Sequence, residues 1–96
     1  MKKIVIAKPF YAINSPTGYK MLQEKGYDIL LNPHNRDFTL EELKQVVGDI
    51  DGIIADSEPW GEEALSAAPK LKIIARYGVG MDSVDIEACK RHGVMV

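Results

Sequence analysis

Short apolar runs alternate along the chain with stretches in which apolar residues have helical spacing. The apolar runs are rich in β-branched residues and too short for helices, as is typical of strands in a parallel sheet. Because a helical stretch and short connections separate each run from the next, the pattern predicts an α/β fold. The predicted strands are residues 3–7, 27–31, 50–55, 71–75 and 94–96.

Start and stop signals delimit the helical stretches. The clearest is a capping box formed by Thr39 and Glu42, preceded by Phe38, which can pack on Leu43. Residues 8–14 have no such signal and are predicted to be a loop. The predicted helices follow Ser15, Thr39, Gly61 and Asp85, and end before Gly26, Gly48, Pro69 and Gly93.

This order of elements predicts a flavodoxin-like parallel sheet with strand order 2-1-3-4-5 and helices on both faces. We expect the sheet to be incomplete at its C-terminal end, because no helix follows the strand that begins at Val94. In such sheets ligands bind at the carboxyl ends of strands 1 and 3. Here those ends are residues 8–11 and 56–60, and the turn at residues 77–81 should lie next to them.

Composition excludes several classes of function. The chain has 96 residues and a formal net charge of −2, so no basic field indicates nucleic acid or an anionic membrane. No apolar run approaches the ~20 residues of a membrane span, and the apolar run after Met1 is too short for a signal peptide. The single cysteine, Cys89, cannot form an internal disulfide, which favours a reducing cytoplasm.

The candidate chemistry lies in a glycine turn after the fourth predicted strand. Gly78 and Gly80 lack a Cβ atom, so the backbone can approach a ligand closely. Successive N–H groups in such a turn can bind an anion, here a small carboxylate. A connecting loop that needs glycine only for its shape is the alternative interpretation.

Other chemistry receives less support. His34, His92 and Cys89 have no metal-ligand spacing, and no catalytic residue or metal site is predicted. A dinucleotide-binding turn is also disfavoured, because the third glycine is missing and no room remains for a ribose-binding acid. A phosphorelay receiver-like module, or another flavodoxin-like binding module, is an alternative, since Asp56 ends the third strand. However, the first strand ends at Lys8 and Pro9 rather than at the carboxylates that Mg²⁺ would need.

Residues 68–96 resemble the end of the first segment of D-isomer-specific 2-hydroxyacid dehydrogenases, in the phosphoglycerate dehydrogenase-like branch. The Gly-Val-Gly-x-Asp-x-Val-Asp order from Gly78 to Asp85 carries most of the resemblance. Asn32-Pro33 with Arg36, and residues 40–43 and 55–65, resemble the same branch.

The resemblance implies that residues 1–96 are the N-terminal segment of a substrate-binding domain. An NAD-binding Rossmann domain and a completing C-terminal segment, which carry the cofactor site and the catalytic arginine, glutamate and histidine, would lie outside it. The full-length enzyme would transfer a hydride between NAD and a 2-hydroxy/2-oxo acid, as a cytoplasmic homodimer. We expect the 96-residue chain alone to be inactive and to self-associate through an uncovered face of the sheet.

The resemblance also implies the substrate-binding residues. Backbone N–H groups of Val79 and Gly80, within the turn that includes Tyr77 and Gly78, would hold the substrate carboxylate. Ser57 would face the substrate from the loop after the third strand. In many family members an arginine precedes that hydroxyl residue, whereas here Asp56 does, and an acid there would repel a phosphate.

Overall fold

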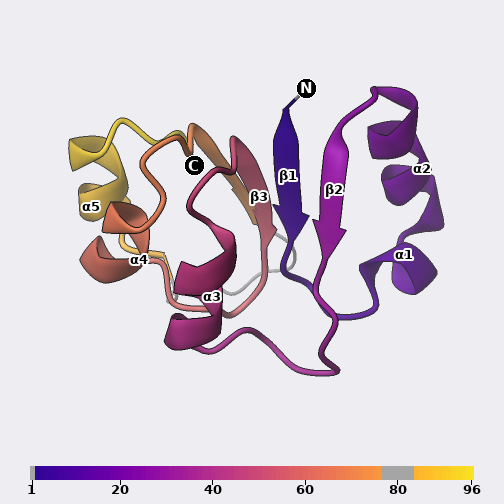
Figure 1. The fold of residues 1–96 in the computed structure, drawn as a ribbon, viewed down its shortest axis with the longest axis horizontal. Helices are drawn as coiled ribbons and strands as arrows, with labels where there is room; N and C mark the ends of the chain where they lie inside the picture. Colours follow the sequence, from indigo (N-terminus) through magenta and orange to yellow (C-terminus); the bar gives the residue numbers. More distant parts are fainter. Residues whose placement is uncertain (1, 77–83) are drawn as a thin grey trace.

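The computed structural model describes residues 2–76 and 84–96, which form one parallel sheet with helices on both of its faces (Figure 1). The strands pair in the order β2-β1-β3-β4, and all three pairs are parallel. The elements are β1 (Lys3–Ile6), α1 (Tyr11–Asn14), α2 (Pro16–Glu24), β2 (Asp28–Leu31), α3 (Leu40–Val46), β3 (Gly52–Ala55), α4 (Glu62–Ser66), β4 (Ile73–Arg76) and α5 (Ile86–Arg91).

The fifth predicted strand is present as a single parallel bridge, in which Met95 pairs with Ile73 of β4. Met95 donates its N–H to the Lys72 carbonyl at 2.9 Å, and its own carbonyl accepts the N–H of Ile74 at 2.8 Å. The chain therefore continues the sheet beyond β4, which confirms the predicted flavodoxin-like order.

Local sequence signals account for most of the helix ends. In α3 the Thr39 hydroxyl accepts the N–H of Glu42, and the Glu42 carboxylate accepts the N–H of Thr39, which is the predicted capping box. Gly93 has a φ of 71° and closes α5 with a Schellman motif, in which Val94 donates to the Cys89 carbonyl at 2.8 Å.

One prediction about this part of the chain is wrong, because residues 8–14 are not entirely a loop. Tyr11–Asn14 form the one-turn helix α1, in which the Phe10 carbonyl accepts the N–H groups of Ile13 and Asn14. Phe10 makes no side-chain cap and has a left-handed φ of 60°, so no start signal announces this turn. Pro16 separates α1 from α2 because a residue that precedes proline avoids helical backbone angles.

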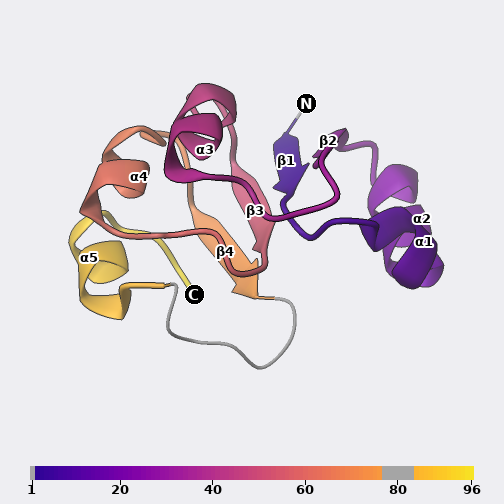
Figure 2. The ribbon, with the colours of Figure 1, turned by 90° about the horizontal axis from the view of Figure 1, so that it is seen from below.

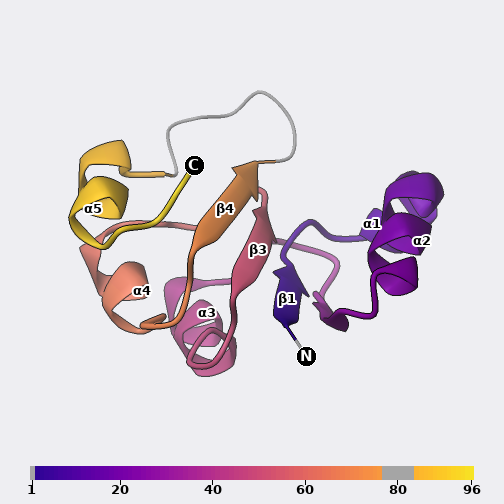
Figure 3. The same cartoon turned by 90° about the horizontal axis from the view of Figure 1, so that it is seen from above.

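The helices cover the two faces of the sheet unequally, as Figures 2 and 3 show. Helices α3, α4 and α5 pack on one face, where the main core lies, while α1 and α2 lie beside the β1–β2 end of the other face. The core face contains Val5, Ala7, Ile53, Ala55 and Ile74.

The opposite face is only partly covered in the described structure. Ile73 is 45% exposed and Ala75 is exposed, although the apolar run at residues 71–75 predicted a strand covered on both faces. That prediction is wrong for this strand: only the side that bears Ile74 is buried.

Candidate functional site

The carboxyl ends of β1 and β3 meet at one edge of the sheet, where the strand order predicts a ligand crevice. Lys8 follows β1, and Asp56 and Ser57 follow β3. The Lys8 Nζ atom lies 3.7 Å from Asp56 Oδ2. Ser57 is exposed at this edge, so its hydroxyl is open to a ligand.

A buried glutamate holds the loop that carries Ser57. The Glu58 side chain is only 1% exposed, and its carboxylate accepts the Asp56 N–H and the Trp60 Nε1–H, each at 2.8 Å. Burial raises the pKa of Glu58, and these two donors act against that rise. Because the residues on both sides of Ser57 are anchored, its position at the edge is well defined.

The segment that contains the glycine turn starts and ends beside this same loop. Arg76, the last residue of β4, pairs in register with Ala55 at the end of β3. Val84 pairs with Trp60, whose carbonyl accepts the Asp85 N–H at 2.8 Å. Tyr77, Gly78, Val79 and Gly80 themselves lie outside the described residues, so their role in substrate binding stays a prediction.

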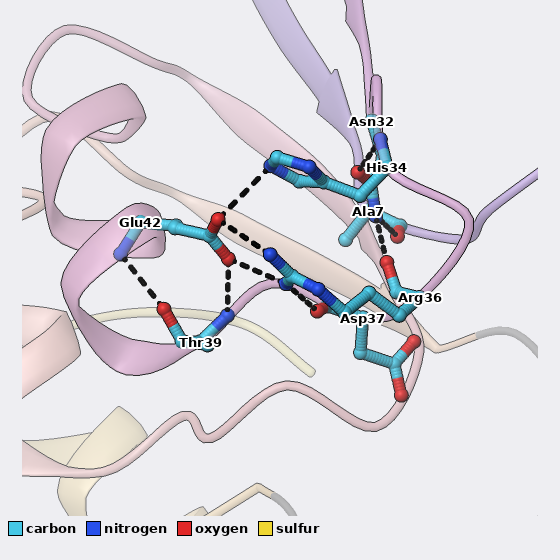
Figure 4. A network of polar contacts seen from close by, with 7 residues as sticks. All are labelled: Ala7, Asn32, His34, Arg36, Asp37, Thr39 and Glu42. Carbon is cyan, nitrogen blue, oxygen red and sulfur yellow. Dashed lines mark hydrogen bonds and ion pairs between the residues drawn. The ribbon is translucent and has the colours of Figure 1, made fainter.

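Asn32 ties the loop between β2 and α3 to the end of β1 (Figure 4). Its side chain is buried, and Nδ2 donates to the carbonyls of Ala7 at 2.8 Å and Arg36 at 2.9 Å. Its Oδ1 atom accepts the N–H of His34 at 2.8 Å. All the polar atoms of this amide therefore organise backbone at the carboxyl edge of the sheet.

The Glu42 carboxylate contacts the side chains of Arg36 and His34 in the same loop, as Figure 4 shows. Arg36 donates to both of its carboxylate oxygens, at 2.7 and 2.9 Å, and His34 Nε2 lies 3.1 Å from Oε2. Arg36 and the Thr39 N–H lower the pKa of Glu42 to about 2. Because this pKa is depressed, the stabilisation is present above pH 4.5 and is lost as the pH falls towards 2.

Asp37 lies on the side of this loop that faces the β3 edge. Its carboxyl group lies near that of Asp56 and near the backbone N–H of Ser57. Burial and the Asp56 carboxyl group raise the pKa of Asp37, while Lys8 and the Ser57 N–H act in the opposite direction. Asp37, Asp56 and Lys8 therefore lie close together at the carboxyl edge.

A cavity of about 250 Å³ lies next to this edge, between the ends of β1 and β2. Lys8, Phe10, Tyr11, Asn32 and His34 are among its lining residues, whereas Ser57 is not. Lys8 lines the cavity and also pairs with Asp56, whereas the predicted substrate residue Ser57 is not part of the lining.

The other titratable candidates have structural partners. His92 Nε2 lies 2.7 Å from Glu62 Oε2 on the surface, and Cys89 is buried in the core, which raises the pKa of its thiol. Within residues 2–76 and 84–96, no group of three or more histidine, cysteine or acidic residues could hold a metal ion. No helix in this described part is long and apolar enough to cross a membrane.

Three residues that build the edge were not predicted from the sequence: Asn32, Asp37 and Glu58. The Asn32 side chain bonds to Ala7, which is 25 residues away, and Asp37 meets a loop from a different strand. No spacing within a single element could have revealed these contacts. The hydrogen bond between Glu58 and Trp60 is the exception, because the two residues are only two positions apart. An acid this close to an indole N–H donor in the sequence could have indicated that contact.

Comparison with known proteins identifies relatives across nearly the whole chain. Residues 4–96 match the family model for the catalytic domain of D-isomer specific 2-hydroxyacid dehydrogenases. The chain is 36% identical to the glyoxylate reductase of Thermococcus kodakarensis, over 82% of this chain and 24% of that protein. It is 32% identical to the D-3-phosphoglycerate dehydrogenase of Rattus norvegicus, over 100% of this chain and 17% of that protein.

A solved structure shows the same fold. The NAD⁺-bound 3-phosphoglycerate dehydrogenase of Entamoeba histolytica superposes with a TM-score of 0.80 and 35% sequence identity, over 97% of this chain and 31% of that chain. The present chain thus spans about a quarter of the length of the glyoxylate reductases that it matches. Sequence and fold agree, and the chain belongs to the D-isomer specific 2-hydroxyacid dehydrogenase family, within its catalytic domain.

Proposed function

We propose that this chain is the N-terminal substrate-binding segment of an NAD-dependent dehydrogenase that interconverts 2-hydroxy and 2-oxo acids. Family membership and the NAD⁺ bound to the relative from Entamoeba histolytica support this proposal. NAD(H), held by a separate domain of the longer polypeptide, would supply or accept the hydride.

One observation carries the proposal: the described residues that flank positions 77–83 lie beside the loop after β3, with Arg76 paired to Ala55 and Val84 to Trp60. The residues on both sides of the predicted carboxylate-binding turn are therefore held near the loop that exposes Ser57. This arrangement supports a site in which N–H groups of Val79 and Gly80 bind the substrate carboxylate while Ser57 donates a hydrogen bond to the same acid. Such preorganised donors need little reorganisation when an anion binds.

The phosphorelay alternative has no support from the geometry. Asp56 follows β3, but it is paired with Lys8, whose Nζ atom lies 3.7 Å from Asp56 Oδ2. The described residues near it provide no group of ligands for a metal ion.

Replacement of Ser57 tests the proposal in the full-length enzyme. We expect Ser57→Ala to raise KM for a 2-oxo acid roughly tenfold, because a hydrogen bond to a charged group is lost. The Kd for NADH should not change, and neither constant should change in the control variant Ser66→Ala, which alters an exposed serine in α4. NADH oxidation by the isolated 96-residue chain would show that the catalytic machinery has been placed wrongly.

A further inference from the structure

A buried acid follows Ser57 directly in the loop after β3. The Glu58 side chain is almost completely buried, although a carboxylate is costly to bury unless its oxygens are hydrogen-bonded. Its Oε1 atom accepts the backbone N–H of Asp56, and its Oε2 atom accepts the Nε1–H of Trp60, each at 2.8 Å. One N–H donor on each oxygen matches an ionised carboxylate, which has only acceptors. Because Glu58 is turned into the core and uses both oxygens there, it is placed to hold the loop and not to contact a ligand.

Trp60 gives this carboxylate a fixed partner. The indole ring is completely buried in the main core. The backbone of Trp60 pairs with Val84 in a parallel bridge, and its carbonyl accepts the N–H of Asp85, the N-cap residue of α5, at 2.8 Å. The indole N–H is therefore held in place both by the core and by a second segment of the chain, and Glu58 is bound to it.

Ser57 lies between the two groups that the carboxylate fixes. It follows Asp56, whose N–H is bound, and it precedes Glu58 itself, while its own side chain is exposed at the sheet edge. Loops that carry binding residues are generally more mobile than the strands they follow. Here two hydrogen bonds to a charged acceptor hold the loop closed, and such bonds are stronger than those between neutral groups. The Ser57 hydroxyl is thus held in place before any ligand binds, which lowers the ordering cost of binding.

We propose that Glu58 is a positioning residue for substrate binding, which acts through Ser57. This inference rests on the proposed function, because that function assigns a substrate contact to the Ser57 hydroxyl. The role requires a carboxylate: a glutamine has one acceptor oxygen, so its NH2 group would face one of the two N–H donors. Glu58 therefore contributes to substrate affinity from inside the core, without contact with the substrate.

The test measures KM in the full-length enzyme for whichever of glyoxylate, pyruvate and hydroxypyruvate it reduces. We expect Glu58→Gln to raise KM about fivefold, because one N–H donor loses its acceptor and the loop around Ser57 is released. The Kd for NADH should not change. In a Ser57→Ala background the same substitution should raise KM by less than about twofold, because the hydroxyl that it positions is already gone.

Glu62→Gln is the matched control. Glu62 also binds two partners, Arg91 at 2.9 Å and His92 at 2.7 Å, but on the exposed side of α4, so this variant should leave KM unchanged. If Glu58→Gln does not fold, as judged by circular dichroism, Trp60→Phe takes its place. It removes the indole donor and should raise KM about threefold, again only where Ser57 is present.

The outcomes separate this inference from the proposed function. An unchanged KM in the folded Glu58 variant, or an equal increase in KM with and without Ser57, overturns the role of Glu58 and leaves the proposed function standing. If Ser57→Ala alone leaves KM unchanged, the proposed substrate contact of Ser57 fails, and the role of Glu58 fails with it. An enzyme that reduces no 2-oxo acid overturns the proposed function as a whole.

Discussion

The two faces of the sheet differ in how completely they are packed. On the α3–α5 face, Ile53 and Ile74 are almost completely buried in one continuous core. On the other face, α1 and α2 cover the β1–β2 end, whereas Ile73 is 45% exposed and the neighbouring Met95 is 67% exposed. Parallel sheets are normally covered on both faces, so this difference marks the second face as a surface for further packing.

Two adjacent residues on β4 allow the packing of the two faces to be compared directly, and here we expect the largest effect. Ile73 and Ile74 are identical side chains on opposite faces of one strand. We expect Ile74→Ala to lower the free energy of unfolding by about 2–5 kcal/mol, because it leaves a cavity in the core. Ile73→Ala should lower it by about 1 kcal/mol or less, because much of that side chain is already in water.

Urea denaturation of both variants measures the two changes in the free energy of unfolding. Equal losses would show that the second face is packed as tightly as the first, and the comparison between the faces would fail. If Ile74→Ala abolishes folding, Ile74→Val provides a smaller loss, about 0.5–1.5 kcal/mol, that can be compared with Ile73→Val.

The sequence predicts the helices and strands better than it predicts which face of a strand is buried. Thr39 and Glu42 are three residues apart, so their capping box is visible as a local pattern, and the structure confirms it. The run Leu-Lys-Ile-Ile-Ala has no alternation that would show which isoleucine is covered. Coverage depends on where helices from elsewhere in the chain come to lie, which no local pattern records.

The candidate site shows the same limit. The position of Ser57 at the edge of the sheet could be predicted, because strand order brings the end of the third strand to the crevice. The contact of Asn32 with Ala7 could not be predicted, because it joins the loop after β2 to the end of β1 across 25 residues of sequence. Long-range polar contacts of this kind are a property of the assembled fold.

A second prediction concerns association through the partly covered face. We expect the isolated chain to self-associate, since exposed Ile73 and Met95 lie side by side on the β4 edge. Ile73→Lys should reduce the mean mass in light scattering towards that of the monomer. Ile13→Lys is the matched control: it changes an isoleucine that is 76% exposed on α1, away from β4, and should have little effect. A wild-type chain that remains monomeric at high concentration would contradict the prediction.

The smallest expected effect lies at Gly52, in the middle of the same face. A Cβ atom there would come within 3.1 Å of Ile4 Cδ1, which ends that side chain, and 3.2 Å of Ile73 Cγ2, a methyl group on the β-carbon. Because Ile73 is partly exposed, it can move aside, and we expect Gly52→Ala to change the free energy of unfolding by less than about 1 kcal/mol. A tightly packed face would instead lose about 1–3 kcal/mol through overpacking. Urea denaturation of Gly52→Ala distinguishes these outcomes, and a loss in the upper range would mean that this face resists expansion as the core face does.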